Sequence, residues 1–251
     1  IRAMNDLYQK VCFQVSKITT SSYSTSFSSG ILLFDKAIRQ DIYNIYGYVR
    51  FADEIVDTYT GDSKVQILQE FKQDTFVAIE RGISLNPIIH AFQLTVNRNQ
   101  IDKVLIEAFL DSMAMDLDQK NYDQSQYKEY IFGSAEVIGL MCLSIFTSDS
   151  RVYQDLKPYA ITLGSVFQKI NFLRDIKSDF HERGRVYFPQ VQFAGFSNNE
   201  KRLIEKEISA ELVVAKKGIL KLPKRARYGV LLAYSYYSVL FDRICLASPM
   251  K

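Results

Sequence analysis

Tryptophan is absent from this chain of 251 residues, and histidine, cysteine and proline are scarce, with two, three and five copies. The two histidines lie far apart, and no Cys/His spacing of the kind that binds zinc occurs. Cys12, Cys142 and Cys245 are also far apart, odd in number and set among apolar neighbours, which predicts buried reduced thiols. This pattern favours a reducing compartment, and we expect a cytoplasmic protein.

Long apolar runs are missing as well, and the printed sequence shows no signal peptide. No stretch approaches the ~18–20 consecutive apolar residues that a membrane-spanning helix needs. Charge of one sign is not concentrated either, since the formal net charge is +3. This mild excess suits anionic substrates or an anionic lipid surface. It does not predict nucleic-acid binding, which usually requires a concentrated basic patch.

Most of the chain has the sequence pattern of α-helices. Hydrophobic residues make up 47% of the chain and charged residues 24%, and with few glycines and prolines long segments keep a helical period. We see no internal repeat and no linker, so an all-α protein with a single domain over residues 1–251 is predicted. The expected helices are Asn5–Ile18, Lys36–Thr58, Val65–Arg81, one beginning at Asn86-Pro87, one from Asp102 through Asp118, Tyr127–Phe146, Ser150–Arg183, Asn198–Lys217 and Arg225–Ile244. The buried face of the first would comprise Leu7, Val11, Cys12, Val15 and Ile18.

The most informative stretch runs from Gln168 to Asp179. Asn171, Asp175 and Asp179 recur every four residues, and Gln168 lies about one turn earlier, so a helix would place all four on one polar ridge. Several residues between them are apolar, which predicts a helix buried over much of its circumference. Carboxylates on such a helix need a positive partner, because an uncompensated buried charge is costly.

A second acidic ridge lies far upstream, where Asp53 and Asp57 are four residues apart and Arg50 precedes them by one turn. Two such ridges facing each other across a cavity would suit Mg²⁺, which binds carboxylate oxygens together with substrate phosphates. Mn²⁺ accepts the same ligands. Tyr43 and Tyr46, on the same predicted helix, are expected to line that cavity. Each ridge alone could equally be a solvated helix face, but the two together favour a metal–diphosphate site.

Two further features could supply phosphate contacts. Guanidinium groups bind phosphate oxygens directly, and the candidates are Arg50, Arg174, Arg183 and Arg185. The segment Thr19–Gly30 is rich in serine and threonine. It is either a flexible linker or a hydroxyl-lined loop that donates hydrogen bonds to phosphate oxygens, and its composition does not choose between them.

These motifs resemble the squalene/phytoene synthase family, and within it the bacterial phytoene and dehydrosqualene synthases, over nearly the whole chain. Arg50–Asp57 resembles the first aspartate-rich motif of the family, and Gln168–Asp179 resembles the second. Arg183–Pro189 looks like the tail that follows it, Ser24–Phe27 like the N-terminal serine-phenylalanine motif, and Met113–Leu117 like the intermediate acidic motif.

The resemblance implies an isoprenoid synthase fold, a single helical bundle around a central cavity. Mg²⁺ would be held by Asp53, Asp57, Asn171, Asp175 and Asp179. Substrate contacts would come from Ser24, Ser26, Phe27, Arg50, Gln168, Asn171, Arg174, Arg185, Tyr187 and Tyr237. Catalytic roles would fall to the four aspartates, Arg50 and the cavity tyrosine Tyr130.

The implied reaction is the head-to-head condensation of two prenyl diphosphates, with geranylgeranyl diphosphate as the expected substrate. It would proceed through a cyclopropyl diphosphate intermediate to phytoene, the first step of carotenoid biosynthesis. The chemistry suits the residues, because a departing diphosphate needs cationic partners and carbocations are stabilised by aromatic walls. A hydrocarbon product also favours peripheral membrane contact during release.

Several alternatives stay open. Two farnesyl diphosphates would give dehydrosqualene, or squalene if NADPH served as hydride donor. A non-catalytic helical protein that retains the fold would be favoured by the loss of a ridge aspartate, and none is lost. A di-iron bundle expects Glu-x-x-His pairs, which neither His90 nor His181 completes. Glu136 stands where the family usually has glycine, and it either reshapes the cavity or points into another helix.

Overall fold

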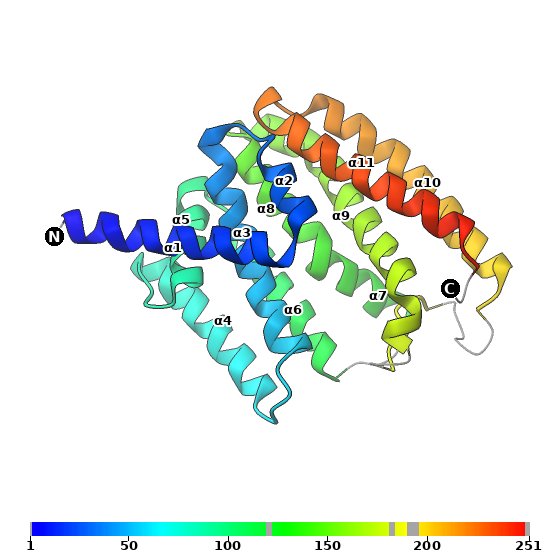
Figure 1. Cartoon of the computed structure of the whole chain (residues 1–251), viewed down its shortest axis with the longest axis horizontal. Coiled ribbons are helices and arrows are strands. Elements are labelled where there is room, and N and C mark those ends of the chain that lie inside the picture. Colours follow the sequence, from blue (N-terminus) through cyan, green and yellow to red (C-terminus); the bar gives the residue numbers. More distant parts are fainter. Residues whose placement is uncertain (1, 119–121, 181–183, 190–195, 249–251) are drawn as a thin grey trace.

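The computed structural model describes residues 2–118, 122–180, 184–189 and 196–248, with side chains from Asp6 onward except that of Asp118. These residues form the all-α bundle that the periodicity predicts (Figure 1). The helices are α1 Arg2–Tyr23, α2 Thr25–Ile31, α3 Lys36–Asp57, α4 Lys64–Arg81, α5 Pro87–Asn99, α6 Lys103–Asp118, α7 Gln124–Ile131, the π-helical turn η1 Phe132–Glu136, α8 Val137–Phe146, α9 Ser150–Ser178, α10 Asn198–Lys221 and α11 Lys224–Leu246.

Several predicted helix starts are confirmed by their caps. Asn86 Oδ1 accepts the backbone N–H of Ile88 at 3.0 Å, at the start of α5. Asp102 Oδ1 accepts the N–H of Val104 at 3.0 Å, at the start of α6. Such side chains satisfy N–H groups that have no partner within the helix. The caps therefore fix where these helices begin.

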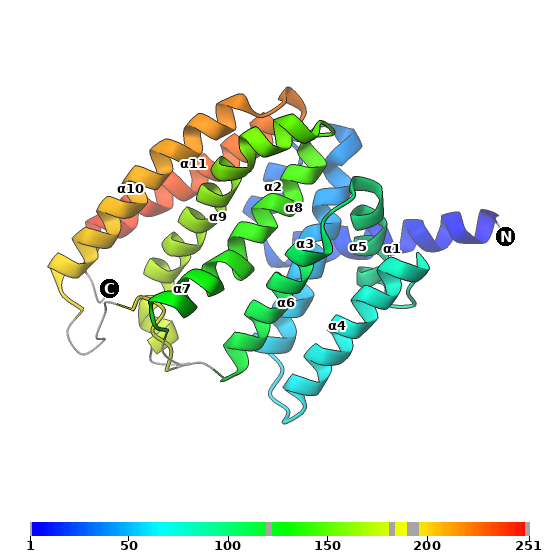
Figure 2. The ribbon, with the colours of Figure 1, turned by 180° about the vertical axis from the view of Figure 1, so that it is seen from behind.

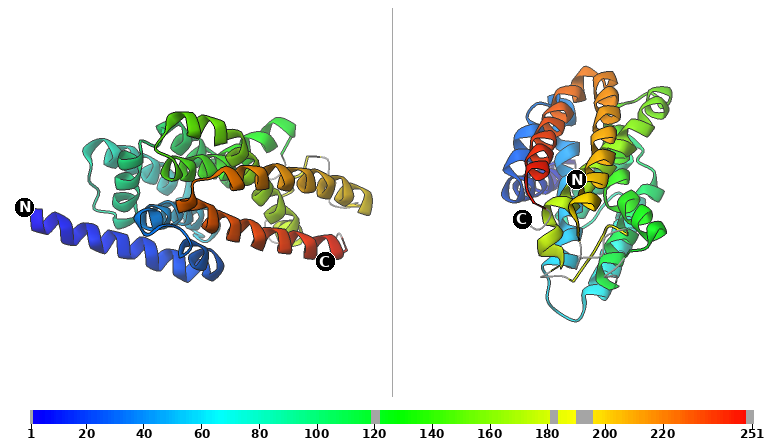
Figure 3. Two further views of the ribbon diagram at one scale, coloured as in Figure 1. Left: turned by 90° about the horizontal axis from the view of Figure 1, so that it is seen from above. Right: turned by 90° about the vertical axis from the view of Figure 1, so that its right-hand side faces the viewer.

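The bundle is arranged so that α3 and α9 run through its middle. Helix α9 contacts α8 on one side and α10 on the other, while α3 contacts α1, α5 and α6. The α10–α11 pair lies along one side of the bundle (Figures 1 and 2). The ends of the chain lie toward opposite ends of the long axis (Figure 3). This arrangement brings the two predicted ridges into one interior.

The prediction for the buried face of α1 is correct only in part. Cys12 is buried as predicted and Val15 packs against the core, but Leu7 and Ile18 are each 65% exposed, and small polar residues such as Ser16 are buried in their place. The physical reason is a close crossing of α1 over α3. A Cβ atom added to Gly47 of α3 would lie 3.3 Å from the Ser16 Cα, so large side chains do not fit between the two backbones.

The hydroxyl-rich segment Thr19–Gly30 is neither a linker nor a loop. It forms the last turn of α1 and nearly all of α2, with a break at Ser24. Its hydroxyls bond within the helix: Thr20 Oγ1 donates to the carbonyl of Ser16 at 2.8 Å, and Ser29 Oγ donates to that of Thr25 at 2.8 Å. Back-bonding of this kind makes serine and threonine compatible with a helix interior.

The sequence holds no run of 18 consecutive apolar residues, as stated above, but one helical stretch is apolar on average. Among the described residues, the continuous helical stretch Gln124–Phe146 is long and apolar enough by length and composition to cross a membrane. Half of the apolar 18-residue segment within it is buried inside the bundle. There a Cβ on Gly133 would lie 2.5 Å from the carbonyl oxygen of Ala108, which shows how closely η1 packs on α6. A core helix of a globular fold has these same properties.

The cysteines are free, as predicted, but they are not all buried. Cys12 is buried, Cys142 is half-buried and Cys245 is exposed near the end of α11. Apolar neighbours in the sequence were therefore a poor guide to burial at Cys245, because one face of α11 is open to solvent.

Candidate active site

A cavity of about 920 Å³ lies between α3, α9 and the helices around them. That volume is near the upper end of the range for small-molecule sites. Its lining residues on α3 run from Ile42 to Asp57, and those on α9 from Leu156 to Asp179. At 1.5 Å per residue, the lining of α3 alone spans about 22 Å. The cavity is apolar at the end near Ile42 and Leu156 and charged at the other.

Every residue to which the resemblance assigned a metal, substrate or catalytic role lines this cavity. The set comprises Ser24, Ser26, Phe27, Arg50, Asp53, Asp57, Tyr130, Gln168, Asn171, Arg174, Asp175, Asp179, Arg185, Tyr187 and Tyr237. Arg183 lies outside the described residues. Tyr46 also lines the cavity as expected, whereas Tyr43 is a buried core residue and does not. The fold thus brings together motifs that are more than 100 residues apart in the chain.

The first ridge is held by Arg50. Its guanidinium pairs with Glu54 through Nη2, lies 3.9 Å from Asp53 Oδ2 through Nη1, and stacks over the Tyr23 ring at 4.3 Å. Its Nε is buried and has no hydrogen-bond partner. Burial raises the pKa of Asp53 to about 7; Arg50 opposes this shift, and the charges of Asp57 and Asp116 add to it. This end of the cavity therefore crowds carboxylates beside an unsatisfied cationic donor.

The second ridge is partly occupied by its own neighbours. Arg174 binds Asp175 with both arms of its guanidinium, Nε to Oδ1 at 2.7 Å and Nη2 to Oδ2 at 2.6 Å. Tyr237 Oη donates to Asn171 Oδ1 at 3.3 Å, and Asn171 Nδ2 donates to Gln168 Oε1 at 3.4 Å. Arg174 and Asp175 thus neutralise each other in part, so a phosphate or a metal ion that binds here would compete with this ion pair.

The serine motif forms the N-terminus of α2. Ser24 Oγ accepts the backbone N–H of Phe27 at 3.2 Å and lies 3.4 Å from Ser26 Oγ. The Phe27 ring stacks on Tyr46 of α3, with ring centroids 4.8 Å apart. Ser24 is therefore a helix cap that also lines the cavity. The same atom, Ser24 Oγ, caps α2 and would contact the substrate.

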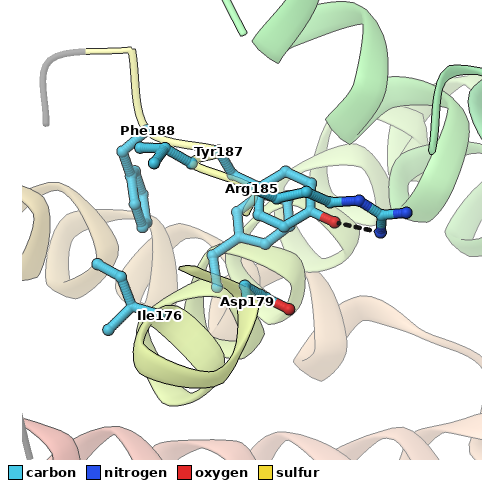
Figure 4. Close-up of a pocket in the computed structure, with 7 residues that line it drawn as sticks. Ile176, Asp179, Arg185, Tyr187 and Phe188 are labelled. Carbon is cyan, nitrogen blue, oxygen red and sulfur yellow. Dashed lines mark hydrogen bonds between the residues drawn. The ribbon is translucent and has the colours of Figure 1, made fainter. Parts of the chain in front are cut away.

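The segment from Gly184 to Phe188 closes one wall of the cavity. Gly184 has a φ of 65°, in the left-handed region that glycine adopts without strain, and the chain turns there. Arg185 then donates to the Tyr187 hydroxyl at 3.3 Å (Figure 4). The Tyr187 ring stacks face to face on Phe172 of α9 at 4.2 Å, and Phe188 meets Phe172 edge-on at 5.8 Å. Aromatic contacts thus attach this non-helical segment to α9.

Asp116 is the residue that the sequence left without a role. It lines the cavity and is buried, with 8% of its surface exposed. Tyr130 Oη donates to its Oδ2 at 2.7 Å, and Arg185 Nη1 lies 3.4 Å from its Oδ1. The signal available in the sequence was its place in the intermediate acidic motif, but only the fold shows which donors surround it.

Carboxylate and amide oxygens from both ridges line the cavity, and they are ligands that suit Mg²⁺. Within the described residues, however, no three Asp, Glu, His or Cys side chains come close enough together to hold a metal ion by themselves. The donor types fit a divalent cation that is completed by water and by substrate phosphate, which is how Mg²⁺ is usually bound.

A sequence profile of squalene/phytoene synthases matches residues 20–247, which is most of the chain. The chain belongs to the squalene/phytoene synthase family. Phytoene synthase of Arthrospira platensis is 28% identical over 262 aligned positions, covering 92% of this chain and 83% of that protein. Phytoene synthase 1 of Solanum lycopersicum, a chloroplast protein, is 26% identical over 247 aligned positions. The match covers 89% of this chain but only 59% of the length of that protein.

Solved structures of this family share the fold. A dehydrosqualene synthase in complex with a ligand superposes with a TM-score of 0.83 at 19% identity, covering 97% of this chain and 91% of its own. Squalene synthase HpnC from Alicyclobacillus acidocaldarius gives 0.81 at 20% identity, covering 95% and 94%. The chain therefore has the isoprenoid synthase fold that its motifs implied.

Within this family pattern, the position of Glu136 is now explained. Its carboxyl group interacts with Ser165 and Lys169 of α9 and with Glu211 of α10, and it is not among the residues that line the cavity. Burial raises the pKa of Glu136 to about 7, with Lys169 opposing the shift and Glu211 adding to it. Of the two interpretations, the one in which Glu136 points into another helix is correct.

Proposed function

We propose that this protein joins two allylic prenyl diphosphates head to head, and that geranylgeranyl diphosphate is converted to phytoene, the first step of carotenoid biosynthesis. The observation that carries the proposal is one cavity that is charged at one end and apolar at the other. Such a cavity matches a molecule with a diphosphate head and a hydrocarbon tail. The names of the curated relatives support the same reaction.

In the proposed reaction, one substrate loses diphosphate and becomes an allylic cation. The double bond of the second substrate attacks this cation, and loss of a proton gives a cyclopropyl intermediate that still carries the second diphosphate. A second ionisation releases that diphosphate, and rearrangement with loss of a proton gives the hydrocarbon. Each ionisation requires cationic groups where the diphosphate departs and an environment that excludes water around the cation.

The residues at the charged end suit the diphosphate. Arg50 offers a buried Nε without a partner, and Arg185 lies in the same wall, so both can bind phosphate oxygens. The hydroxyls of Ser24 and Ser26 can donate to further oxygens. Arg174 would join them after releasing Asp175. We propose that these groups bind the diphosphates of both substrates and stabilise the negative charge that develops on each diphosphate as it departs.

We further propose that Mg²⁺, or Mn²⁺ in its place, is held by Asp53, Asp57, Asn171, Asp175 and Asp179. Crowding of carboxylates around Asp53 supports this assignment, because burial raises the pKa of Asp53, the charges of Asp57 and Asp116 add to the rise against the opposing effect of Arg50, and a divalent cation would relieve the repulsion between the carboxylates. When bound, the metal ion would supply Lewis-acid charge to the departing diphosphate.

Aromatic side chains line the region beside the ridges. Phe167 stacks on Tyr237 with centroids 3.9 Å apart, and Tyr130 and Tyr187 lie 5.2 Å apart in a second group with Phe172. The faces of such rings attract cations and do not react with them as water would. We assign to them the stabilisation of the carbocations that follow each ionisation.

The second candidate reaction uses two farnesyl diphosphates. It is favoured by the similarity of the whole fold to a dehydrosqualene synthase. The product would be dehydrosqualene, or squalene if NADPH supplied a hydride. The two candidate reactions differ in the length of the prenyl chain that the apolar end of the cavity must accept.

The experiment is product analysis. Purified protein is incubated with Mg²⁺ and either geranylgeranyl or farnesyl diphosphate, with and without NADPH, and the extracted hydrocarbon is identified by mass. A forty-carbon product without NADPH supports phytoene synthesis, and a thirty-carbon product moves the assignment to the farnesyl branch. Absence of hydrocarbon from either substrate would favour a non-catalytic protein that retains the fold.

We also propose peripheral membrane contact at the opening of the cavity. Tyr23, Leu232 and Tyr236 line the cavity and are nevertheless 49%, 40% and 54% exposed. Leu32 and Leu33, just after α2, are 55% and 49% exposed, and α2 packs on α11. Apolar side chains around an opening suit a hydrocarbon that must pass into lipid, since such side chains can enter the interfacial layer of a bilayer.

This proposal is tested by co-sedimentation with phosphatidylcholine vesicles, with and without anionic lipid. Replacing Leu32 and Leu33 by aspartate should release the protein from vesicles. Leu203 of α10 is 64% exposed and does not line the cavity, so Leu203→Asp is the matched control and should bind as the unmodified protein does. If Leu203→Asp lost vesicle binding as much as the Leu32 and Leu33 variant did, the proposed membrane contact at the cavity opening would be wrong.

A further inference from the structure

Four donor groups converge on the carboxylate of Asp116. Tyr130 Oη donates to Oδ2 at 2.7 Å, and the hydroxyls of Tyr122 and Tyr187 donate to Oδ1 at 3.3 Å each. Arg185 Nη1 lies 3.4 Å from Oδ1. An ionised carboxylate only accepts hydrogen bonds, so it matches surroundings that only donate. A neutral amide of the same shape would direct its own N–H groups at one or more of these donors.

The contact with Tyr130 decides how this phenol can meet a cation. Its hydrogen is directed at Asp116 at 2.7 Å, so the oxygen lone pairs and the ring remain as its electron-rich parts. Donation to an anion increases the electron density of the phenol, which strengthens its attraction for a nearby cation. Both Tyr130 and Asp116 line the cavity, whereas Tyr122 does not.

The contacts with Arg185 connect this tyrosine to the diphosphate end. Arg185 Nη2 donates to the backbone carbonyl of Asp116 at 2.5 Å, and Arg185 Nη1 lies between the carboxylates of Asp116 and Asp57, at 3.4 and 4.0 Å. The guanidinium is therefore fixed by the same residue that fixes the phenol. Asp116 determines the orientation of one group suited to the cation and of another suited to the departing anion.

We propose that Asp116 is a positioning residue for the condensation, which holds Tyr130 as a hydrogen-bond donor so that its ring and oxygen lone pairs face the carbocation, and which fixes Arg185 beside the diphosphate. The inference rests on the proposed function. In Asp116→Asn, at least one of the surrounding phenols must reverse its hydrogen to accept from the amide. The cation then meets a less favourable surface and survives for a shorter time before water captures it.

The test compares Asp116→Asn, Tyr130→Phe and Tyr122→Phe for kcat, KM and the ratio of hydrocarbon to prenyl alcohol and released cyclopropyl intermediate. We expect kcat of Asp116→Asn to fall on the order of tenfold to a hundredfold, the usual cost of losing an outer partner that orients a functional group. The product ratio should shift toward alcohol and intermediate. Tyr130→Phe should shift the ratio in the same direction.

Tyr122→Phe is the matched control, because it removes one 3.3 Å hydrogen bond to the same carboxylate from a ring outside the cavity. Its product ratio should equal that of the unmodified protein. When Tyr130 is already replaced by Phe, adding Asp116→Asn should cause no further change in the product ratio. The KM for the prenyl diphosphate should nevertheless rise, because Arg185 is no longer fixed beside the diphosphate. A role confined to stability would lower the yield of folded protein without changing the ratio.

The outcomes separate the two claims. If the unmodified protein makes no hydrocarbon from either prenyl diphosphate, the proposed function and this inference are both overturned. If it makes hydrocarbon and Asp116→Asn retains its kcat and product ratio, only the inference is overturned. If Asp116→Asn does not fold, Tyr130→Phe decides, and an unchanged product ratio in that variant overturns the inference.

Discussion

A buried ammonium group connects α9 to α10, and its removal should destabilise the fold measurably. Lys169 Nζ lies 2.5 Å from Glu207 Oε1 and 2.6 Å from Glu211 Oε1, with only 7% of the lysine side chain exposed. Glu136 of η1 interacts with the same lysine. Lys169→Met keeps a similar length of apolar side chain but removes the cation shared by three carboxyl groups.

The expected cost follows from what the substitution leaves behind. Glu211 has only a quarter of its side chain exposed, and its Oε2 already has no hydrogen-bond partner, so it would remain as a poorly solvated anion. Removing one partner of a buried ion pair typically costs about 3–5 kcal/mol. Glu207 is 58% exposed and returns to water easily, so we expect the lower end, about 3 kcal/mol. For a chain of this size that corresponds to a fall in Tm of roughly 6–12 °C.

The assay is urea and thermal unfolding followed by circular dichroism at pH 8. Lys72→Met is the matched control, because Lys72 Nζ lies at the same 2.5 Å from Asp111 Oδ1, but those side chains are 33% and 58% exposed. Exposed pairs contribute about 0–1 kcal/mol, so this variant should unfold close to the unmodified protein. If Lys169→Met lost no more stability than Lys72→Met, burial would not be the factor that makes the Lys169 cluster important.

Two further predictions concern the helices around the cavity. Because burial raises the folded-state pKa of Glu136 above its usual value to about 7, the protonated form is favoured on folding, and stability falls as pH rises from about 4.5 to 7. Glu136→Gln should therefore be more stable than the unmodified protein at pH 8, with the difference shrinking below pH 5, as read from urea midpoints; a constant difference would contradict this. Gly133→Ala should cost about 1–3 kcal/mol through overpacking, since its Cβ would lie 2.5 Å from the Ala108 carbonyl oxygen. The same urea titration measures that loss, and an unchanged midpoint would show that α6 can move aside.

The sequence was sufficient to predict most helices and the composition of the site. Residues four apart on a helix share a face whatever surrounds it, so Asp53 with Asp57 and Asp175 with Asp179 could be grouped from spacing alone. Apolar flanks indicated that both helices are buried. That the two ridges meet came from the resemblance and from charge, since spacing within one helix says nothing about which other helix it faces.

Features that depend on packing between helices were not predictable in the same way. Hydroxyl-rich composition could not show that Thr20 and Ser29 bond to their own helix. The apolar periodicity of α1 selected Leu7 and Ile18, because nothing in one helix reveals a close crossing at Gly47.

Asp116 was missed as a hydrogen-bonding centre for a related reason. Its tyrosine donors come from residues 6, 14 and 71 positions later in the chain, and they converge only after α7 and the segment around Tyr187 have packed against α6. A long-range arrangement of this kind has no period that a sequence could display.

The balance of charge in the cavity gives a physical reason to expect a metal requirement. Among the described residues that line it, the charged side chains are five aspartates, Asp53, Asp57, Asp116, Asp175 and Asp179, and three arginines, Arg50, Arg174 and Arg185. The formal charge is thus negative before any substrate enters, although the proposed substrates are themselves anions. Like charges at close range oppose binding, and divalent cations are the simplest way to reverse that sign. Calorimetric titration of a non-hydrolysable prenyl diphosphate analogue should therefore show binding with Mg²⁺ and at least tenfold weaker binding in EDTA, and Asp53→Asn with Asp175→Asn should lessen this dependence. Equal affinity with and without the metal ion would mean that the arginines alone overcome the aspartates, and the proposed metal site would be wrong.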